Sequence, residues 1–305
     1  MQSKLIAILL AGVIASGMIC THPAFAHNFG GDESATWIAK VAEIKTEASI
    51  VAKHVGDKSA IDYYFDALGE YWNANDTKEM GERNTLLQQE IPTTINQTLN
   101  DARTIGNQNT VNDDVVKLSG YLDESIPVRV DPDKLNNSTI QVLSVTFVLK
   151  EALEKYGTAV NSTIDLNDMS QMKMDNMSGS MSMVNTIVNP NAYENSIGLA
   201  TAAQNLFNDI AAKNSDKSDA NTKISTAFTK LVQDLNGKAD VNTIMMDVHI
   251  NLHPVLIDTY NLPISSHGTN NPGSAVPEFP LPALLIVVSI TGVIVATRLK
   301  SRIGF

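Results

Sequence analysis

The stretch WIAKVAEIKTEASIVAKHV, residues 37–55, decides the fold class of this chain of 305 residues. Its apolar residues recur every three or four positions, at Trp37, Val41, Ile44 and Ala48. This spacing places them on one face of an amphipathic α-helix. Such a helix gains most of its stability by packing its apolar face against other elements, so the stretch predicts a helical bundle.

The same periodicity continues along most of the chain. A helix start is indicated at Asp76, a capping residue that Glu79 follows three positions later. Pro92 is expected to kink or interrupt the polar helix that comes next. The expected helical ranges are 37–55, 61–72, 76–99, 111–122, 193–212, 219–235 and 241–260.

The run TIQVLSVTFVL, residues 139–149, is ambiguous because it is rich in β-branched residues that favour strands. The charged continuation at residues 150–155 is helical in character, and no partner strand is visible nearby. We therefore interpret the run as one buried helix. With it, the whole exported region is expected to be all-α.

Two helical halves are expected, because each opens with an Ala-rich helix and continues into shorter ones. The N-terminal helical domain spans 27–160 and the C-terminal helical domain spans 189–262, separated by a Met-rich flexible loop at 161–188. This similar order of helices fits either two paired bundles or a single bundle of two related halves.

The sequences at the two ends of the chain predict its cellular location. Residues 1–26 have the basic residue, apolar run and Ala-Phe-Ala ending of a secretory signal peptide. A stalk and sorting motif at 263–280 precedes an apolar segment at 281–297, which is just long enough to cross a bilayer, and a basic tail at 298–305. The chain is therefore expected to be extracellular and anchored to the cell membrane by one C-terminal transmembrane helix.

The composition limits the partners of the exported region. Its formal net charge of −11 argues against nucleic acid as a partner and favours cations or simple solubility. The single cysteine, Cys20, lies in the signal peptide, so the mature chain is expected to have no disulfide. Glycosylation sequons occur at Asn75, Asn96, Asn136, Asn137, Asn161 and Asn176.

The strongest chemical signal is a cluster of methionines in a polar segment that has no Leu, Ile or Val among them. Thioethers are soft ligands that suit Cu(I) among biological metals. Compositional drift in a linker is the other interpretation of the cluster. The candidate ligands are Met169, Met172, Met174, Met177, Met181 and Met183.

A second signal is the sequence MMDVHINLHP, residues 245–254. His249 and His253 are four positions apart and can share a metal on one helical face, with Met245 one turn earlier. Pro254 disfavours helical geometry at His253. A structural or surface role for the pair is the other interpretation.

His27 becomes the first residue after cleavage, and its imidazole and α-amine together suit Cu(II). The sequence has no nucleophile elbow, zinc-protease motif, phosphate-binding Gly-rich loop or cysteine nucleophile, so no enzyme is predicted. A copper oxidoreductase would need a rigid site of several histidines, whereas those of the mature chain are scattered.

The C-terminal sequence Pro277-Glu278-Phe279-Pro280, followed by an apolar span and a basic tail, resembles the PEF-CTERM sorting signals that archaeosortases read. Ammonia-oxidising archaea use a related form in which glycine stands where this chain has Pro280. The resemblance implies an archaeal surface protein and an archaeosortase-like processing enzyme as a partner.

The exported region is similar to uncharacterised surface proteins of the same archaeal group, most specifically at 82–84, in the methionine segment and at 248–254. Its helical pattern also resembles the exported domains of iron-permease and imelysin-like proteins, which hold metals. Since ammonia-oxidising archaea depend on extracellular copper enzymes, the resemblance favours copper. The expected function is non-enzymatic binding, buffering or delivery of copper, and the alternative is a structural or adhesive envelope protein without a metal.

Overall fold

Helices make up the regular structure of the chain in a computed structural model that describes residues 31–104, 107–172 and 184–263. No strand occurs among these residues, so the predicted all-α fold is confirmed for them. The helices are α2 (Glu33–Val51), α3 (Lys58–Tyr71), α4 (Ala74–Arg83), α5 (Thr85–Arg103), α6 (Gln108–Arg129), α7 (Pro132–Leu135), α8 (Ser138–Ala159), α9 (Pro190–Lys213), α10 (Ser218–Asn236), α11 (Val241–Met246) and α12 (His253–Tyr260), with a π-helical segment at Asp247–Leu252 and short 3₁₀ turns at Ala52–His54, Met169–Gln171 and Ser215–Lys217.

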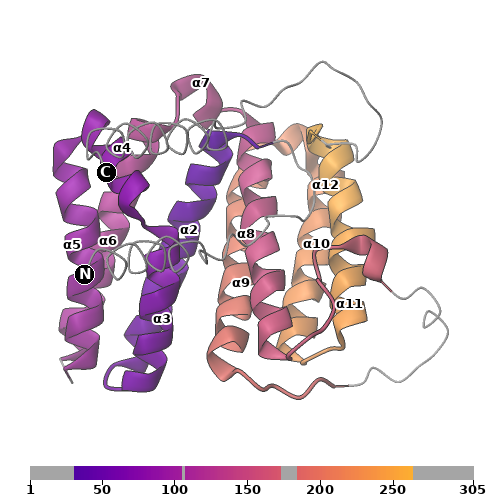
Figure 1. Cartoon of the computed structure of the whole chain (residues 1–305). Helices are drawn as coiled ribbons and strands as arrows, with labels where there is room; N and C mark the ends of the chain where they lie inside the picture. Colours follow the sequence, from indigo (N-terminus) through magenta and orange to yellow (C-terminus); the bar gives the residue numbers. More distant parts are fainter. Residues whose placement is uncertain (1–30, 105–106, 173–183, 264–305) are drawn as a thin grey trace, which may run out of the picture. The chain divides into compact units, whose positions relative to one another are not determined.

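The helices enclose two hydrophobic cores, and α2 lies between them (Figure 1). The N-terminal core is built from α2 to α6, and the C-terminal core from α8 to α12 together with part of α2. Trp37 and Val41 of α2 belong to the N-terminal core, whereas Ala35 and Ala39 belong to the C-terminal core. The helix formed by the stretch at 37–55 is therefore buried on two sides, whereas its periodicity predicted a single buried face.

The ambiguous run at 139–149 forms the buried first half of α8, as predicted. Packing explains why β-branched residues are helical here: Val142, Val145 and Val148 are all completely buried in the C-terminal core. α8 packs most extensively on α9. The expected domain boundary at residue 160 therefore does not coincide with the division between the cores, which lies before α8.

Two local expectations in the N-terminal core need correction. α4 begins at Ala74, because Asn73 caps it and Asp76 closes the capping box from the third helical position. Of the two outcomes expected at Pro92, a kink or an interruption, the interruption is ruled out, because α5 continues through this residue to Arg103. The sequence therefore correctly indicates a capping box, but the cap is Asn73, three positions before the predicted Asp76.

Among the residues that the structure describes, no helix is long and apolar enough to cross a membrane. The predicted signal peptide at 1–26, most of the stalk, the apolar segment at 281–297 and the basic tail lie outside the described residues. The methionine segment is described only at its two ends, 161–172 and 184–188. Backbone hydrogen bonds hold both ends against the bundle. At the first end the amide of Ser162 donates to the carbonyl of Gly157 in α8 at 2.8 Å, and at the second the amide of Val188 donates to the carbonyl of Ala159 in α8 at 2.8 Å.

Candidate functional site

The two candidate histidines lie side by side at the point where the last helix changes its winding. His249 is in the π-helical segment and His253 begins α12, and their ring centroids are 5.4 Å apart at an interplanar angle of 73°. Both side chains are buried, as is Met245 at the end of α11. The structure therefore brings the histidine pair together, as its spacing predicted.

Pro254 explains the change of winding. Proline has no amide hydrogen to donate to the carbonyl four positions earlier, so a regular α-helix cannot continue through it unchanged. The amide of His253 instead donates to the carbonyl of Val248, five positions earlier. His253 keeps helical dihedral angles, φ −57° and ψ −45°, so the expected loss of helical geometry at this residue does not occur. π-Turns of this kind are frequent at functional sites.

The start of the methionine segment contacts this histidine directly. Nε2 of His249 lies 2.8 Å from the carbonyl oxygen of Leu166, which can only accept, so Nε2–H is the donor. In a neutral imidazole with this tautomer the lone pair is on Nδ1. A backbone carbonyl that fixes the second ring nitrogen is a common arrangement for histidines that bind metals.

Burial also favours the uncharged form of His249. Removal from water lowers its pKa below the ordinary value of 6.5 and outweighs the opposing effects of the Leu166 carbonyl and of Asp165 and Asp168. Since only the neutral ring offers a lone pair, His249 is in the protonation state that a metal requires.

The described methionines among the candidate ligands occupy three different environments. Met169 is exposed in the 3₁₀ turn, Met172 is half-buried against the C-terminal core, and Met245 is completely buried inside it. Met172 and Met245 therefore both contribute to packing. The remaining candidates, His27, Met174, Met177, Met181 and Met183, lie outside the described residues.

In the described part of the chain, no three His, Cys, Asp or Glu side chains converge on one point that could hold a metal ion. The histidine pair is thus at most half of a four-coordinate site, and further ligands must be thioethers, carbonyls or residues of the methionine segment. Asp247, a potential carboxylate neighbour, is already engaged by Lys230 at 2.7 Å.

A second buried polar cluster was not predicted as a site. Glu43 and Glu47 lie on α2 on the side that meets the other helices, and Glu151 approaches from α8. Burial, followed by repulsion from Glu151, raises the pKa of Glu43 to about 8, so its carboxyl group is protonated at neutral pH. This cluster places acidic groups where the two cores meet.

The neighbours of these carboxyl groups come from α8 itself and from two further helices, α3 and α9. Tyr71 of α3 donates to Oε1 of Glu151 at 3.0 Å, and Lys155 of α8 lies 3.0 Å from the same oxygen. The side-chain amide of Asn195 on α9 donates to Glu47. The sequence carries a signal for this cluster, since the two glutamates are four positions apart and therefore lie on one side of α2.

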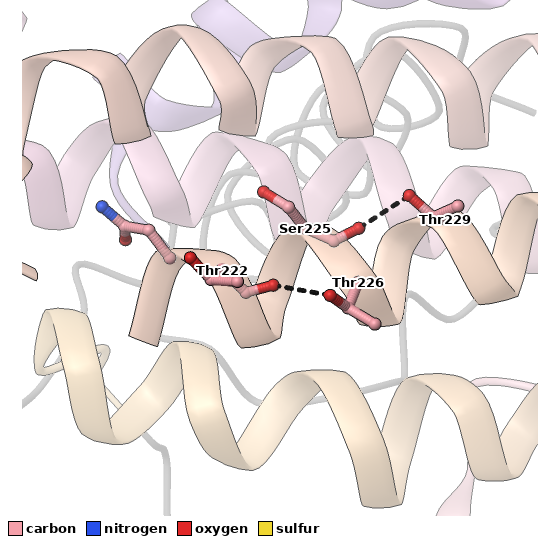
Figure 2. Close-up of a pocket in the computed structure, with 5 residues that line it drawn as sticks. Thr222, Ser225, Thr226 and Thr229 are labelled. Carbon is pink, nitrogen blue, oxygen red and sulfur yellow. Dashed lines mark hydrogen bonds between the residues drawn. The ribbon is translucent and has the colours of Figure 1, made fainter. Parts of the chain in front are cut away.

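Pockets of other kinds lie on the surface, and two of them are the largest described. One, of about 400 Å³, follows α10 and is lined by Asn221 and by the hydroxyl residues Thr222, Ser225, Thr226 and Thr229 (Figure 2). Its three threonine hydroxyls donate to the carbonyls four positions earlier, so their hydrogen atoms are already used by the helix. The other, of about 800 Å³, is an open groove between α2 and α9.

Comparison of the chain with protein-family models, with curated proteins and with solved structures finds no match.

Proposed function

We propose that this chain is an exported, membrane-tethered protein that binds copper and passes it on without catalysing a reaction. The observation that carries the proposal is the contact between His249 and Leu166, which joins the buried histidine pair to the start of the methionine segment. This contact brings the start of the methionine segment to the histidine pair, although about 80 positions separate them in the sequence. Both segments carry side chains of types that can bind copper.

The ligand types suit two successive steps. Thioethers in a polar segment collect Cu(I) with low affinity at each sulfur, and several such sulfurs on one tether raise the effective concentration of ligands. The imidazoles of His249 and His253 form a more ordered nitrogen site that retains the ion or delivers it. Met172, which lies against the same core, is the described methionine best placed to link them.

The proposed location rests on the sequence at both ends. A signal peptide at 1–26 would export the chain, and the segment at 281–297 would anchor it with the basic tail inside. An archaeosortase-like enzyme is the proposed processing partner at residues 277–280. A net charge of −11 would favour the approach of cations to the exported region.

Titration with Cu(I) under a competing chelator tests the binding. The protein is the full-length chain in detergent carrying Cys20→Ser, so that no thiol competes. Replacing the six segment methionines (169, 172, 174, 177, 181 and 183) by leucine is expected to abolish stoichiometric uptake. The double variant His249→Gln, His253→Gln is expected to take up copper but release it at lower chelator concentrations.

Two matched control variants each replace a methionine or a histidine that is not among the proposed copper ligands. Met80→Leu changes a buried methionine of the N-terminal core, and His54→Gln changes a histidine that pairs with Glu194. Both should bind as the parent protein does. Uptake that persists in the six-leucine variant would rule out the segment as the collector. No uptake by the parent protein would favour the structural or adhesive envelope function instead.

A further inference from the structure

Five of the six glycosylation sequons lie in the described part of the chain, and their structural settings differ. Transfer of a glycan to asparagine requires an accessible side-chain amide, and the sequon also requires the hydroxyl two positions later. The structure therefore allows the sequons to be compared by whether both groups are exposed and unengaged. The five are Asn75, Asn96, Asn136, Asn137 and Asn161, whereas Asn176 lies outside the described residues.

Two sequons lie within helices and have an engaged hydroxyl. Asn96 is in α5, where its amide donates to the carbonyl of Pro92 at 2.9 Å, and the hydroxyl of Thr98 is completely buried. Asn75 is in the first turn of α4, and the hydroxyl of Thr77 accepts from the indole of Trp72 at 2.9 Å. Neither presents both groups to an enzyme.

Two overlapping sequons lie at the start of α8 and are also engaged. The amide of Asn136 donates to the carbonyl of Pro132 at 3.1 Å. The side-chain oxygen of Asn137 caps α8 by accepting from the amide of Thr139, and the hydroxyl of Thr139 donates to the carbonyl of Tyr260 at 2.8 Å. Modification at Asn137 would therefore compete with the cap of the helix.

Asn161 differs from these four. It lies in the turn directly after α8 with φ +52°, a left-handed conformation that asparagine tolerates better than most residues. Asn161 and Thr163 are both exposed, and within the described residues neither side chain makes a hydrogen bond. Ser162, between them, is half-buried and fixes the turn, since its hydroxyl accepts from the amide of Ile164 at 3.0 Å.

We infer that Asn161 is a site of N-linked glycosylation, an inference that rests on the proposed export of the chain. The donor is a glycan joined through phosphate to a membrane lipid. Nδ2 of Asn161 forms a bond to the anomeric carbon of the glycan, the bond from that carbon to the phosphate oxygen breaks, and the lipid phosphate leaves. The amide loses one hydrogen as a proton, and no oxidation or reduction occurs.

Peptide mass spectrometry tests the site, because trypsin separates the sequons. The tryptic peptide 156–173 holds Asn161 and no other sequon, while 59–78, 84–103 and 135–150 hold the others that the structure describes. The full-length chain is produced with its own signal in a host that glycosylates exported proteins. A short tag that contains an additional sequon is inserted after residue 27. Glycosylation of this tag shows that the chain was exported and that the glycan-transferring enzyme of the host was active.

The expected result is a glycan on peptide 156–173 and not on the other three peptides. Asn161→Asp, which keeps tolerance for the left-handed turn, and Thr163→Ala should both abolish it. Thr163→Ser, which restores the hydroxyl, and Ser162→Ala should both retain it. A modified tag with an unmodified Asn161 would overturn the inference while leaving export intact. An unmodified tag, with protease unable to reach the chain on intact cells, would overturn the proposed location together with this site.

Discussion

Replacement of Glu43 by glutamine should stabilise the folded chain at neutral pH. The Glu43 side chain is 9 % exposed on α2, and its pKa is raised from 4.5 to about 8 by burial and by Glu151. At pH 7 the folded state therefore holds a proton that the unfolded state has released. Taking up that proton costs about 3 kcal/mol, since pH 7 lies about 2.5 units above 4.5 and each unit is worth about 1.36 kcal/mol.

The sign of the effect follows from the raised pKa. A carboxyl group whose pKa is higher in the folded state favours folding most below its unfolded pKa, and this contribution is lost as pH rises from 4.5 towards about 8. Glutamine is neutral at every pH and has nearly the same shape. Glu43→Gln should therefore unfold like the parent protein near pH 4 and be more stable by about 3 kcal/mol at pH 7.

Urea denaturation at a series of pH values between 4 and 8 measures this difference. Glu82→Gln, which removes an exposed carboxyl group of α4, is the matched control and should follow the parent protein. Parallel pH profiles for the parent and Glu43→Gln would show that the carboxyl group is not held protonated. A loss of stability at pH 7 would contradict the reasoning altogether.

Three other substitutions have expected outcomes that the same denaturation measurements check. Asp32→Ala removes the cap of α2 and a bridge to Lys134, and should cost about 1 kcal/mol; because these partners lower the pKa of Asp32 despite its partial burial, the loss should disappear in acid. Phe207→Ala removes a fully buried ring and should cost about 3 to 5 kcal/mol at any pH. Lys230→Met leaves the buried carboxyl group of Asp247 without its cation, and should cost about 2 kcal/mol at neutral pH and less in acid.

Most of the helices could be predicted because hydrophobic periodicity is a local property. Even the β-branched run at 139–149 was assigned correctly, because its charged continuation is helical in character and no partner strand was available. Local motifs are predicted less exactly: the sequence favours Asp76 as the cap of α4, although Asn73 fills that position. A capping box can be read in more than one register when several polar residues precede a helix.

The arrangement of the cores could not be read from the same pattern. A helical period shows which residues share a face, but it does not show which helices meet that face. Ala35 and Ala39 of α2 contact the C-terminal core, whereas Trp37, Val41 and Ala48 contact the N-terminal core. For the same reason the sequence alone does not show that Glu43 and Glu47 are buried, since only tertiary contacts show that other helices cover their side of α2.

Only the proximity of the two histidines in the candidate site could be predicted. The spacing of His249 and His253 indicated that they would be neighbours, and they are. The contact with Leu166 could not be predicted, because it joins a helix to an irregular segment that has no periodicity. The methionines at 174, 177, 181 and 183 and His27 lie outside the described residues, so their role as ligands stays a prediction.

The position of α2 between the two cores determines how cooperatively the helical unit unfolds. Because this single helix lends side chains to both cores, removing either set of partners would leave one of its faces in water. Neither half could then melt alone without weakening the other. Heating should therefore give one cooperative transition, and a gene fragment that ends at residue 137 should yield a chain that proteases digest quickly.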